Sequence, residues 1–297
     1  SETYVTVVND MEDKTATIEA WQDELCIYKG ILFHNRVFEN DFSADISYDF
    51  TCDEYSALRE RYDLAAIAGT GSDFEKASRL TAYLAPKLTH KGDYDNHIAC
   101  NALSLLEYSL SHPEHGINCL NKSKILQECC LALGIYARRV CITPYSPYDY
   151  DNHVVTEIYD RALQKWVMLD ATANGYFTDE NSTPLSVLEM REHFALNRTC
   201  NFTKLSGEVA EYFTSHEEEQ IYYNNYFAKN LFYLIVDQRN GFGEKDAYLR
   251  FIPKGFDDNA RWEMNKLFRL NKTNDYEPPH DTRNRGCNID CLTKSPL

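Results

Sequence analysis

Three residues of the chain have the types needed for an activated cysteine nucleophile: Cys119, His153 and Asp170. Cys119 follows a glycine-containing turn and opens an apolar helical pattern. Backbone N–H groups and the positive end of the helix dipole favour a thiolate at such a position. An imidazole can take the thiol proton, and a carboxylate can orient that imidazole. The three residues therefore predict attack of a sulfur on a carbonyl carbon.

His153 and Asp170 are expected to face each other across a β-hairpin. Two strand-like runs, residues 153–159 and 165–170, flank a short polar turn. Directly opposed residues in an antiparallel hairpin have position numbers with a constant sum, and this pair centres the turn at residues 161–162. Their Cβ atoms would then lie about 4.5–5.5 Å apart, within reach of a carboxylate that holds one imidazole tautomer.

Four blocks in chain order resemble the core of the transglutaminase-like superfamily: Gly116–Cys119, Leu133–Val140, Asn152–Glu157 and Lys165–Thr172. The resemblance covers roughly residues 55 to 195. It implies a papain-related fold in which a nucleophile helix packs on an antiparallel sheet. By this similarity Cys119 is the nucleophile, His153 the general base and acid, and Asp170 the orienting carboxylate. The Asp-Pro-Thr sequence common in the family is Asp170-Ala171-Thr172 here, which leaves the triad intact.

Four further residues are candidates for the oxyanion hole or the substrate cleft. Asn118 and Asn101 could assist the Cys119 backbone N–H in binding an oxyanion, although Asn118 is also a natural helix N-cap. Trp166 and Tyr145 could line a cleft, but a buried core position explains Trp166 equally well.

The spacing of apolar residues predicts the elements that position these side chains. Ser72 and Glu75 form a capping-box pattern, so a helix is expected over residues 73–85. The helix that begins at Cys119 should end at Gly134, its natural C′ residue. Further predicted elements are a helix over residues 99–110 and strands over residues 4–8, 15–21, 27–33, 135–142, 153–159, 165–170, 231–236 and 248–252.

These elements predict an α+β fold: a transglutaminase-like, papain-related core with β-containing N- and C-terminal flanks. We expect a β-rich segment at residues 1–52, the catalytic core at residues 53–200, and an α+β segment packed on that core at residues 201–297. No internal repeat or low-complexity linker separates them.

The resemblance does not select one reaction, because the superfamily includes peptidases, transglutaminases, deamidases and amidases. Hydrolysis of a protein or peptide amide is the favoured hypothesis, since an amine acceptor needs a dedicated, water-excluding site. The alternatives are a transglutaminase and a non-catalytic protein-binding module on the same fold. Filled nucleophile, base and carboxylate positions favour an enzyme.

Composition narrows the choice of partner. The 297 residues carry a formal charge of −16, which argues against nucleic-acid binding and mildly favours basic or neutral substrates. No apolar run is long enough to span a membrane. Ten cysteines are too sparse for a disulfide scaffold and indicate a reduced, cytoplasmic chain, an expectation that a removed leader would reverse.

No cofactor and no metal site are assigned from the sequence. Cys287 and Cys291, with His280 upstream, form only a weak zinc pattern, and no EF-hand spacing is present. No feature of the sequence indicates an oligomeric state.

Overall fold

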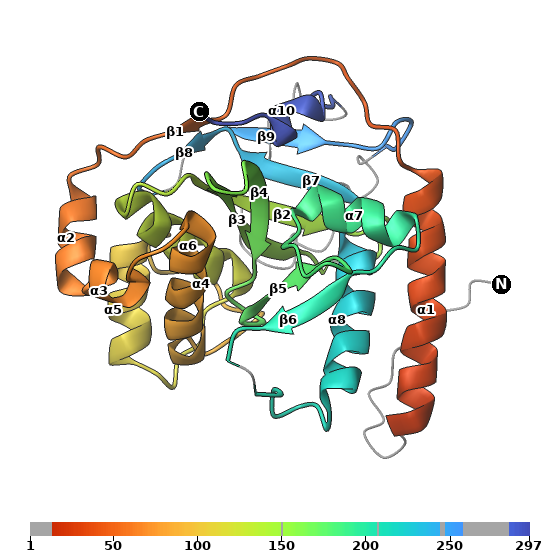
Figure 1. The fold of residues 1–297 in the computed structure, drawn as a ribbon, viewed down its shortest axis with the longest axis horizontal. Coiled ribbons are helices and arrows are strands. Elements are labelled where there is room, and N and C mark those ends of the chain that lie inside the picture. The colour runs from red at the N-terminus through yellow and green to blue at the C-terminus, as the bar shows by residue number, and fades with distance from the viewer. Residues whose placement is uncertain (1–13, 150, 207, 244–246, 258–284) are drawn as a thin grey trace.

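The structure is a computed structural model that describes residues 14–149, 151–206, 208–243, 247–257 and 285–297 (Figure 1). Its centre is a five-stranded sheet in the order β4–β3–β2–β7–β9, in which every neighbouring pair is antiparallel. These strands are β2 (Ala137–Thr143), β3 (His153–Asp160), β4 (Lys165–Leu169), β7 (Tyr233–Asp237) and β9 (Tyr248–Phe251). Two smaller sheets pair β5 (Gly175–Thr178) with β6 (Asn201–Lys204), and β1 (Ser47–Tyr48) with β8 (Arg239–Asn240).

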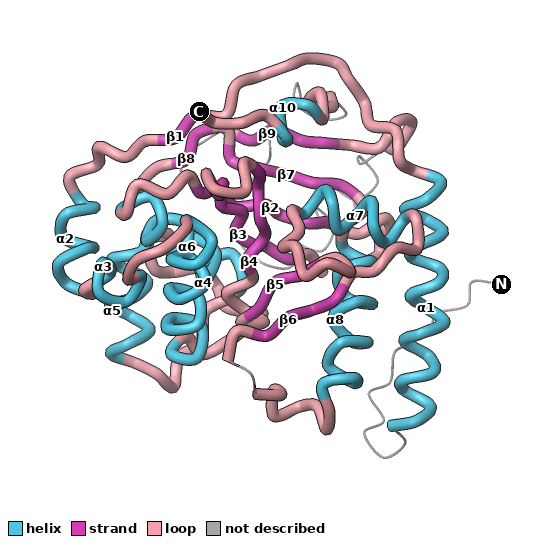
Figure 2. Tube along the Cα trace, in the orientation of Figure 1, coloured by secondary structure: helices cyan, strands magenta, loops and turns pink. Residues whose placement is uncertain are grey.

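Two groups of helices lie on either side of the central sheet (Figures 1 and 2). One group consists of α2 (Glu54–Arg61), α3 (Leu64–Ala68), α4 (Asp73–Leu84), the 3₁₀ turn η1 (Ala85–Lys87), α5 (Ala102–Ser111) and α6 (Cys119–Ala132). The other consists of α1 (Lys14–His34), α7 (Val187–Ala195) and α8 (His216–Asn230), and the short α10 (Asp290–Thr293) lies near the C-terminus. The predicted α+β class is confirmed.

Alternating residues of the central strands pack into two separate hydrophobic cores, one on each face of the sheet. In β4, Val167 and Leu169 pack with helices α2 to α6, whereas Met168 between them packs with α7 and α8. In β3, Ile158 joins the first core and Val155 the second. This period of two is what a strand buried on both faces requires.

The predicted helix caps are confirmed. Ser72 accepts a hydrogen bond from the Glu75 backbone N–H while the Glu75 side chain accepts one from the Ser72 N–H, so α4 begins with a full capping box. Gly134 follows α6 with a positive φ of 73°, the left-handed conformation expected of a C′ glycine.

The strands predicted at residues 15–21 and 27–33 are wrong, because both runs lie within helix α1. Leu25, Tyr28 and Leu32 recur at helical spacing and pack in the second core, a period that the strand interpretation missed. The run at residues 4–8 lies outside the described residues. Residues 201–297 contribute helices α8 and α10 and strands β6 to β9, and strand β7 pairs directly with β2 inside the central sheet.

Gly116 offers a test of the packing that holds the turn before α6. A Cβ at Gly116 would lie 2.5 Å from the Lys91 Cβ and 3.0 Å from the His90 carbonyl carbon, so the turn tolerates no side chain. We expect Gly116→Ala to lower the free energy of unfolding by about 1–3 kcal/mol. Gly30→Ala in α1, where nothing lies within 4 Å, should instead raise it by about 0.5–1 kcal/mol.

Urea unfolding curves of the two variants and the parent would measure both changes as shifts of the midpoint at constant slope. Equal midpoints for Gly116→Ala and the parent would contradict the close packing of this turn.

Candidate active site

Cys119 is the first residue of α6, on a turn anchored to the preceding loop. The Asn118 side chain caps the helix by accepting a hydrogen bond from the Asn121 N–H at 3.2 Å. Ile117 donates its N–H to the Thr89 carbonyl and accepts one from Lys91, each at 3.0 Å. The partly buried thiol therefore lies at the positive end of a well-anchored helix dipole.

His153 and Asp170 form a buried hydrogen bond. The His153 Nε2 lies 2.8 Å from the Asp170 Oδ2, and the two residues are only 4% and 1% exposed. The second carboxylate oxygen of Asp170 accepts the Thr172 backbone N–H at 2.7 Å. One oxygen of the Asp170 carboxylate is thus held by His153 and the other by the Thr172 N–H, and this carboxylate in turn orients the His153 ring.

The two residues are diagonal neighbours, not directly opposed ones, so the predicted register is wrong by two positions. Thr156 pairs with Leu169, so the position numbers of directly opposed residues add up to 325. The numbers 153 and 170 add up to 323. Asp160 shapes the turn: its Oδ1 accepts the N–H groups of Ala162 and Leu163, both at 2.8 Å. A shift of two residues keeps every side chain on its face, which is why the pair still meets.

The imidazole of His153 is influenced by Cys119 and packs against two aromatic rings of α8. Its Nε2 is used by Asp170, which leaves Nδ1 for proton exchange, and Cys119 helps to raise the pKa of the imidazole. The ring centroids of Tyr226 and Phe227 lie 5.4 and 5.7 Å from that of His153, both edge-on. No local pattern in the sequence indicates that Tyr226 and Phe227 pack on His153, because α8 follows β3 by more than 50 residues.

Electrostatics favour an imidazolium next to a carboxylate. Burial opposes the charged form of His153, but the charge and hydrogen bond of Asp170, together with Cys119, raise the pKa of His153 well above its ordinary value. Burial likewise disfavours the charged form of Asp170, yet His153 and the backbone N–H groups of Thr172 and Ala173 lower its pKa. The site can therefore hold a proton on the imidazole.

Lys122 is a second charged group at this site that sequence reasoning missed. It lies one helical turn after Cys119 and is 2% exposed. Its backbone N–H donates to the Asn118 carbonyl at 3.1 Å, whereas its ammonium has no hydrogen bond or ion pair with a residue that the structure describes. Burial lowers the pKa of Lys122 to about 8, although Asp170 and Cys119 raise it. The negative groups of the site are thus its electrostatic partners. His90 is also coupled electrostatically to the site: burial, Lys122 and His153 lower its pKa, while Asp170 raises it.

The remaining candidates have other contacts. Asn101 caps α5 by accepting the Ser104 N–H at 2.9 Å. Trp166 is buried at 4% exposure, with the Arg138 guanidinium 3.7 Å from its ring centroid. Tyr145 is half exposed, and its ring packs 4.9 Å from that of Phe232. The structure therefore brings Asn118 to the turn at Cys119, whereas the contacts of Asn101, Trp166 and Tyr145 given above lie elsewhere.

Comparison with known proteins identifies the class of this domain. Residues 62–171 match the family model of the transglutaminase-like superfamily, a range that contains Cys119, His153 and Asp170. This part of the chain is a transglutaminase-like domain. No curated protein and no solved structure matches the chain. None of the described helices is sufficiently long and apolar to cross a membrane.

Lys122→Met should separate a role at the site from a role in stability. At pH 7 the buried Lys122 ammonium is charged in the folded protein. Burial lowers its pKa from the ordinary 10.5 to about 8, which corresponds to a loss of up to about 3 kcal/mol in the free energy of unfolding. We expect the variant to be more stable than the parent at pH 7 but slower to react at Cys119. The gain in stability should shrink as pH rises from 8 to 10.5, because the unfolded chain then holds more protons than the folded one.

Lys124→Met is the matched control, since Lys124 is equally buried on α6 but lies 3.1 Å from Glu128. Its loss leaves a buried carboxylate without its cation and should destabilise the protein. Denaturant unfolding at several pH values and the rate of iodoacetamide labelling at Cys119 give both quantities. Loss of stability in Lys122→Met with unchanged labelling would mean that Lys122 is only structural.

Proposed function

We propose that the protein is a cysteine-dependent enzyme that hydrolyses an amide bond of a protein or peptide through a thioester intermediate. The single observation that carries the proposal is the buried hydrogen bond between His153 and Asp170, together with a cysteine at the start of a helix, Cys119, that raises the pKa of the same imidazole. The match of the domain to the transglutaminase-like superfamily supports cysteine chemistry at this position.

In the first half-reaction the Cys119 sulfur attacks the amide carbonyl carbon. A C–S bond forms and the carbonyl oxygen becomes an oxyanion. The imidazolium of His153 then donates its proton to the amide nitrogen, the C–N bond breaks, and the amine leaves a thioester on Cys119. The raised pKa of His153 suits this step, because it keeps the proton available near neutral pH.

In the second half-reaction His153 takes a proton from water and the resulting hydroxide adds to the thioester. Collapse of this intermediate releases the carboxylic acid and returns the sulfur to the thiolate form, paired with the protonated imidazole. The N–H of Cys119 at the helix start and the charge of Lys122 are the groups that favour an oxyanion here. Asp170 orients the imidazole throughout.

Transamidation is the second candidate, because an amine could replace water in the same second step. The domain class is compatible with it. Hydrolysis is preferred because water is abundant, whereas an amine must be bound and water excluded. The charge of −16 favours basic or neutral protein substrates for either reaction.

Selective labelling tests the nucleophile. A thiol-directed peptide acyl probe at neutral pH should label Cys119 first, and Cys119→Ala should neither be labelled at this site nor turn over substrate. Burial raises the pKa of Cys129 and Cys130, so both should remain unlabelled. Peptide mapping by mass spectrometry identifies the labelled residue. Equal labelling of several cysteines would exclude a single activated thiol.

Asp170→Asn tests the orienting carboxylate. The amide is of similar size but cannot stabilise an imidazolium, so we expect turnover to fall by about 10²–10⁴-fold with little change in KM. The pKa of His153 should fall in the same variant, because the charge of Asp170 is the largest influence that raises it. Histidine NMR titration and steady-state kinetics measure the two effects, and wild-type turnover in the variant would remove Asp170 from the mechanism.

The reaction type is measured with one amide substrate in the presence and absence of a primary amine. Free acid as the main product at millimolar amine supports hydrolysis. A predominant amine adduct would replace the hydrolase proposal with a transglutaminase. Absence of an acyl-enzyme with every probe would favour the protein-binding module.

A further inference from the structure

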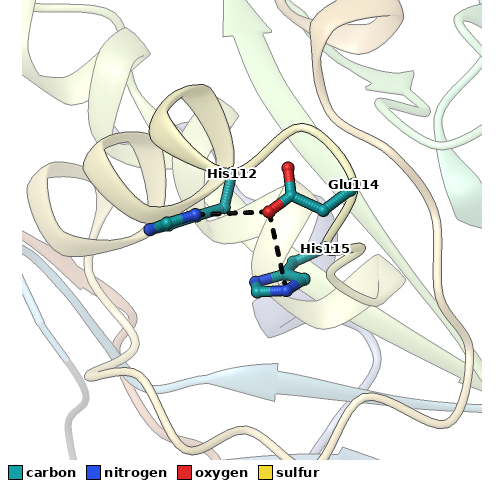
Figure 3. Close-up of side chains that lie close together, drawn as sticks. All are labelled: His112, Glu114 and His115. Atoms are coloured by element: carbon teal, nitrogen blue, oxygen red, sulfur yellow. Dashed lines mark hydrogen bonds and ion pairs between the residues drawn. The ribbon is translucent and has the colours of Figure 1, made fainter.

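Three exposed side chains converge on the loop between α5 and α6: His112, Glu114 and His115 (Figure 3). The Glu114 Oε1 lies 3.3 Å from the His112 Nδ1 and 3.7 Å from the His115 Nε2. All three donor atoms lie within 4.8 Å of one another. We infer that this His-Pro-Glu-His turn is a surface zinc site with two imidazole ligands and one carboxylate ligand.

The separations of the donor atoms fit tetrahedral zinc. Zinc binds imidazole nitrogen and carboxylate oxygen at about 2.0–2.2 Å, and tetrahedral bonds of this length place neighbouring ligand atoms about 3.4 Å apart. The two separations to the Glu114 oxygen, 3.3 and 3.7 Å, lie on either side of this value. The third separation, between the nitrogens of the two histidines, is at most 4.8 Å, and rotation of one exposed ring can shorten it.

The local backbone already holds the two imidazoles on one side of the loop. The His115 N–H bonds to the His112 carbonyl at 2.8 Å, and the Thr89 hydroxyl bonds to the Pro113 carbonyl at 2.7 Å. The two imidazole rings are stacked, with centroids 5.2 Å apart and planes inclined by 23°. Tyr108 lies beside both rings. Binding a metal would therefore require little further ordering.

The chemistry of the donors selects the class of metal. Two imidazoles favour zinc and similar transition metals over calcium and magnesium, which prefer oxygen ligands. A glutamate side chain is ordinarily ionised at neutral pH, so Glu114 can supply a carboxylate oxygen. Across the described residues, no other three histidine, cysteine or acidic side chains come as close together.

Three protein ligands on an exposed turn leave one coordination position for water or for a ligand from another molecule. The side chains are 51–62% exposed, so this position is open to solvent. The turn leads directly through Gly116 into Cys119. A bound zinc would thus brace the segment that carries the proposed nucleophile, whether or not the chain is an enzyme.

Isothermal titration of the full chain with zinc tests the site. The titration uses a Cys119→Ser background, which removes the thiol that could bind the metal together with the His153 imidazole at the candidate active site. We expect one equivalent to bind, and the double variant His112→Ala/His115→Ala to lose that binding. Glu114→Gln should weaken it by at least about 10-fold, the lower end of what outer-shell substitutions cost.

His216→Ala is the matched control, because His216 is exposed and lies 3.9 Å from a Glu219 oxygen without being part of a cluster of three. It should bind zinc like the parent. Cobalt substitution gives a second readout: an absorption spectrum without a sulfur-to-cobalt charge-transfer band supports nitrogen and oxygen ligands. Failure of the parent to bind zinc, undiminished binding in the double variant, or a thiolate band from the bound cobalt would each overturn the proposal.

Discussion

The candidate active site depends on a contact that water would weaken: the hydrogen bond between His153 and Asp170. Both groups are almost fully enclosed, so each imposes a desolvation cost that only the other, with nearby N–H groups, can offset. The fold must therefore close around this pair from both sides. It does so where the sheet ends, with α6 on one face and α8 on the other.

This enclosure explains why α6 is buried around its whole circumference despite its polar sequence. Its polar side chains find partners inside the protein: Gln127 donates to the Asn240 side chain at 2.8 Å, and Glu128 accepts the Ala102 N–H at 2.7 Å. Asn240 belongs to the C-terminal flank. The flank that completes the sheet with β7 also fixes the helix that presents Cys119, so the site depends on residues well beyond the range of the family match.

Local signals in the sequence predicted much of the arrangement. The caps at Ser72 and Gly134 are short-range chemistry, and the helices they bound were predicted to within a few residues. The residues of the proposed triad could be selected from the sequence because few residue types can serve as nucleophile, general base or orienting carboxylate. The hairpin register was wrong because the Asp160 side chain, not the strand pattern, sets the turn. Helix α1 was missed because its short apolar runs, such as residues 31–33, resemble strands, although Leu25, Tyr28 and Leu32 recur at helical spacing and pack in the second core.

The burial of Lys122 could not be predicted in the same way, because a lysine on a polar helix is normally solvated. Burial of α6 removes it from water, and Asp170 and Cys119 are the groups that offset its charge. An unpaired buried cation costs stability wherever it lies, and an apolar residue of similar length would fill the same space without that cost. Lys122 lies one helical turn from the proposed nucleophile. The same charge that destabilises the folded chain would stabilise a thiolate or an oxyanion beside it, which is a chemical reason to keep a lysine there.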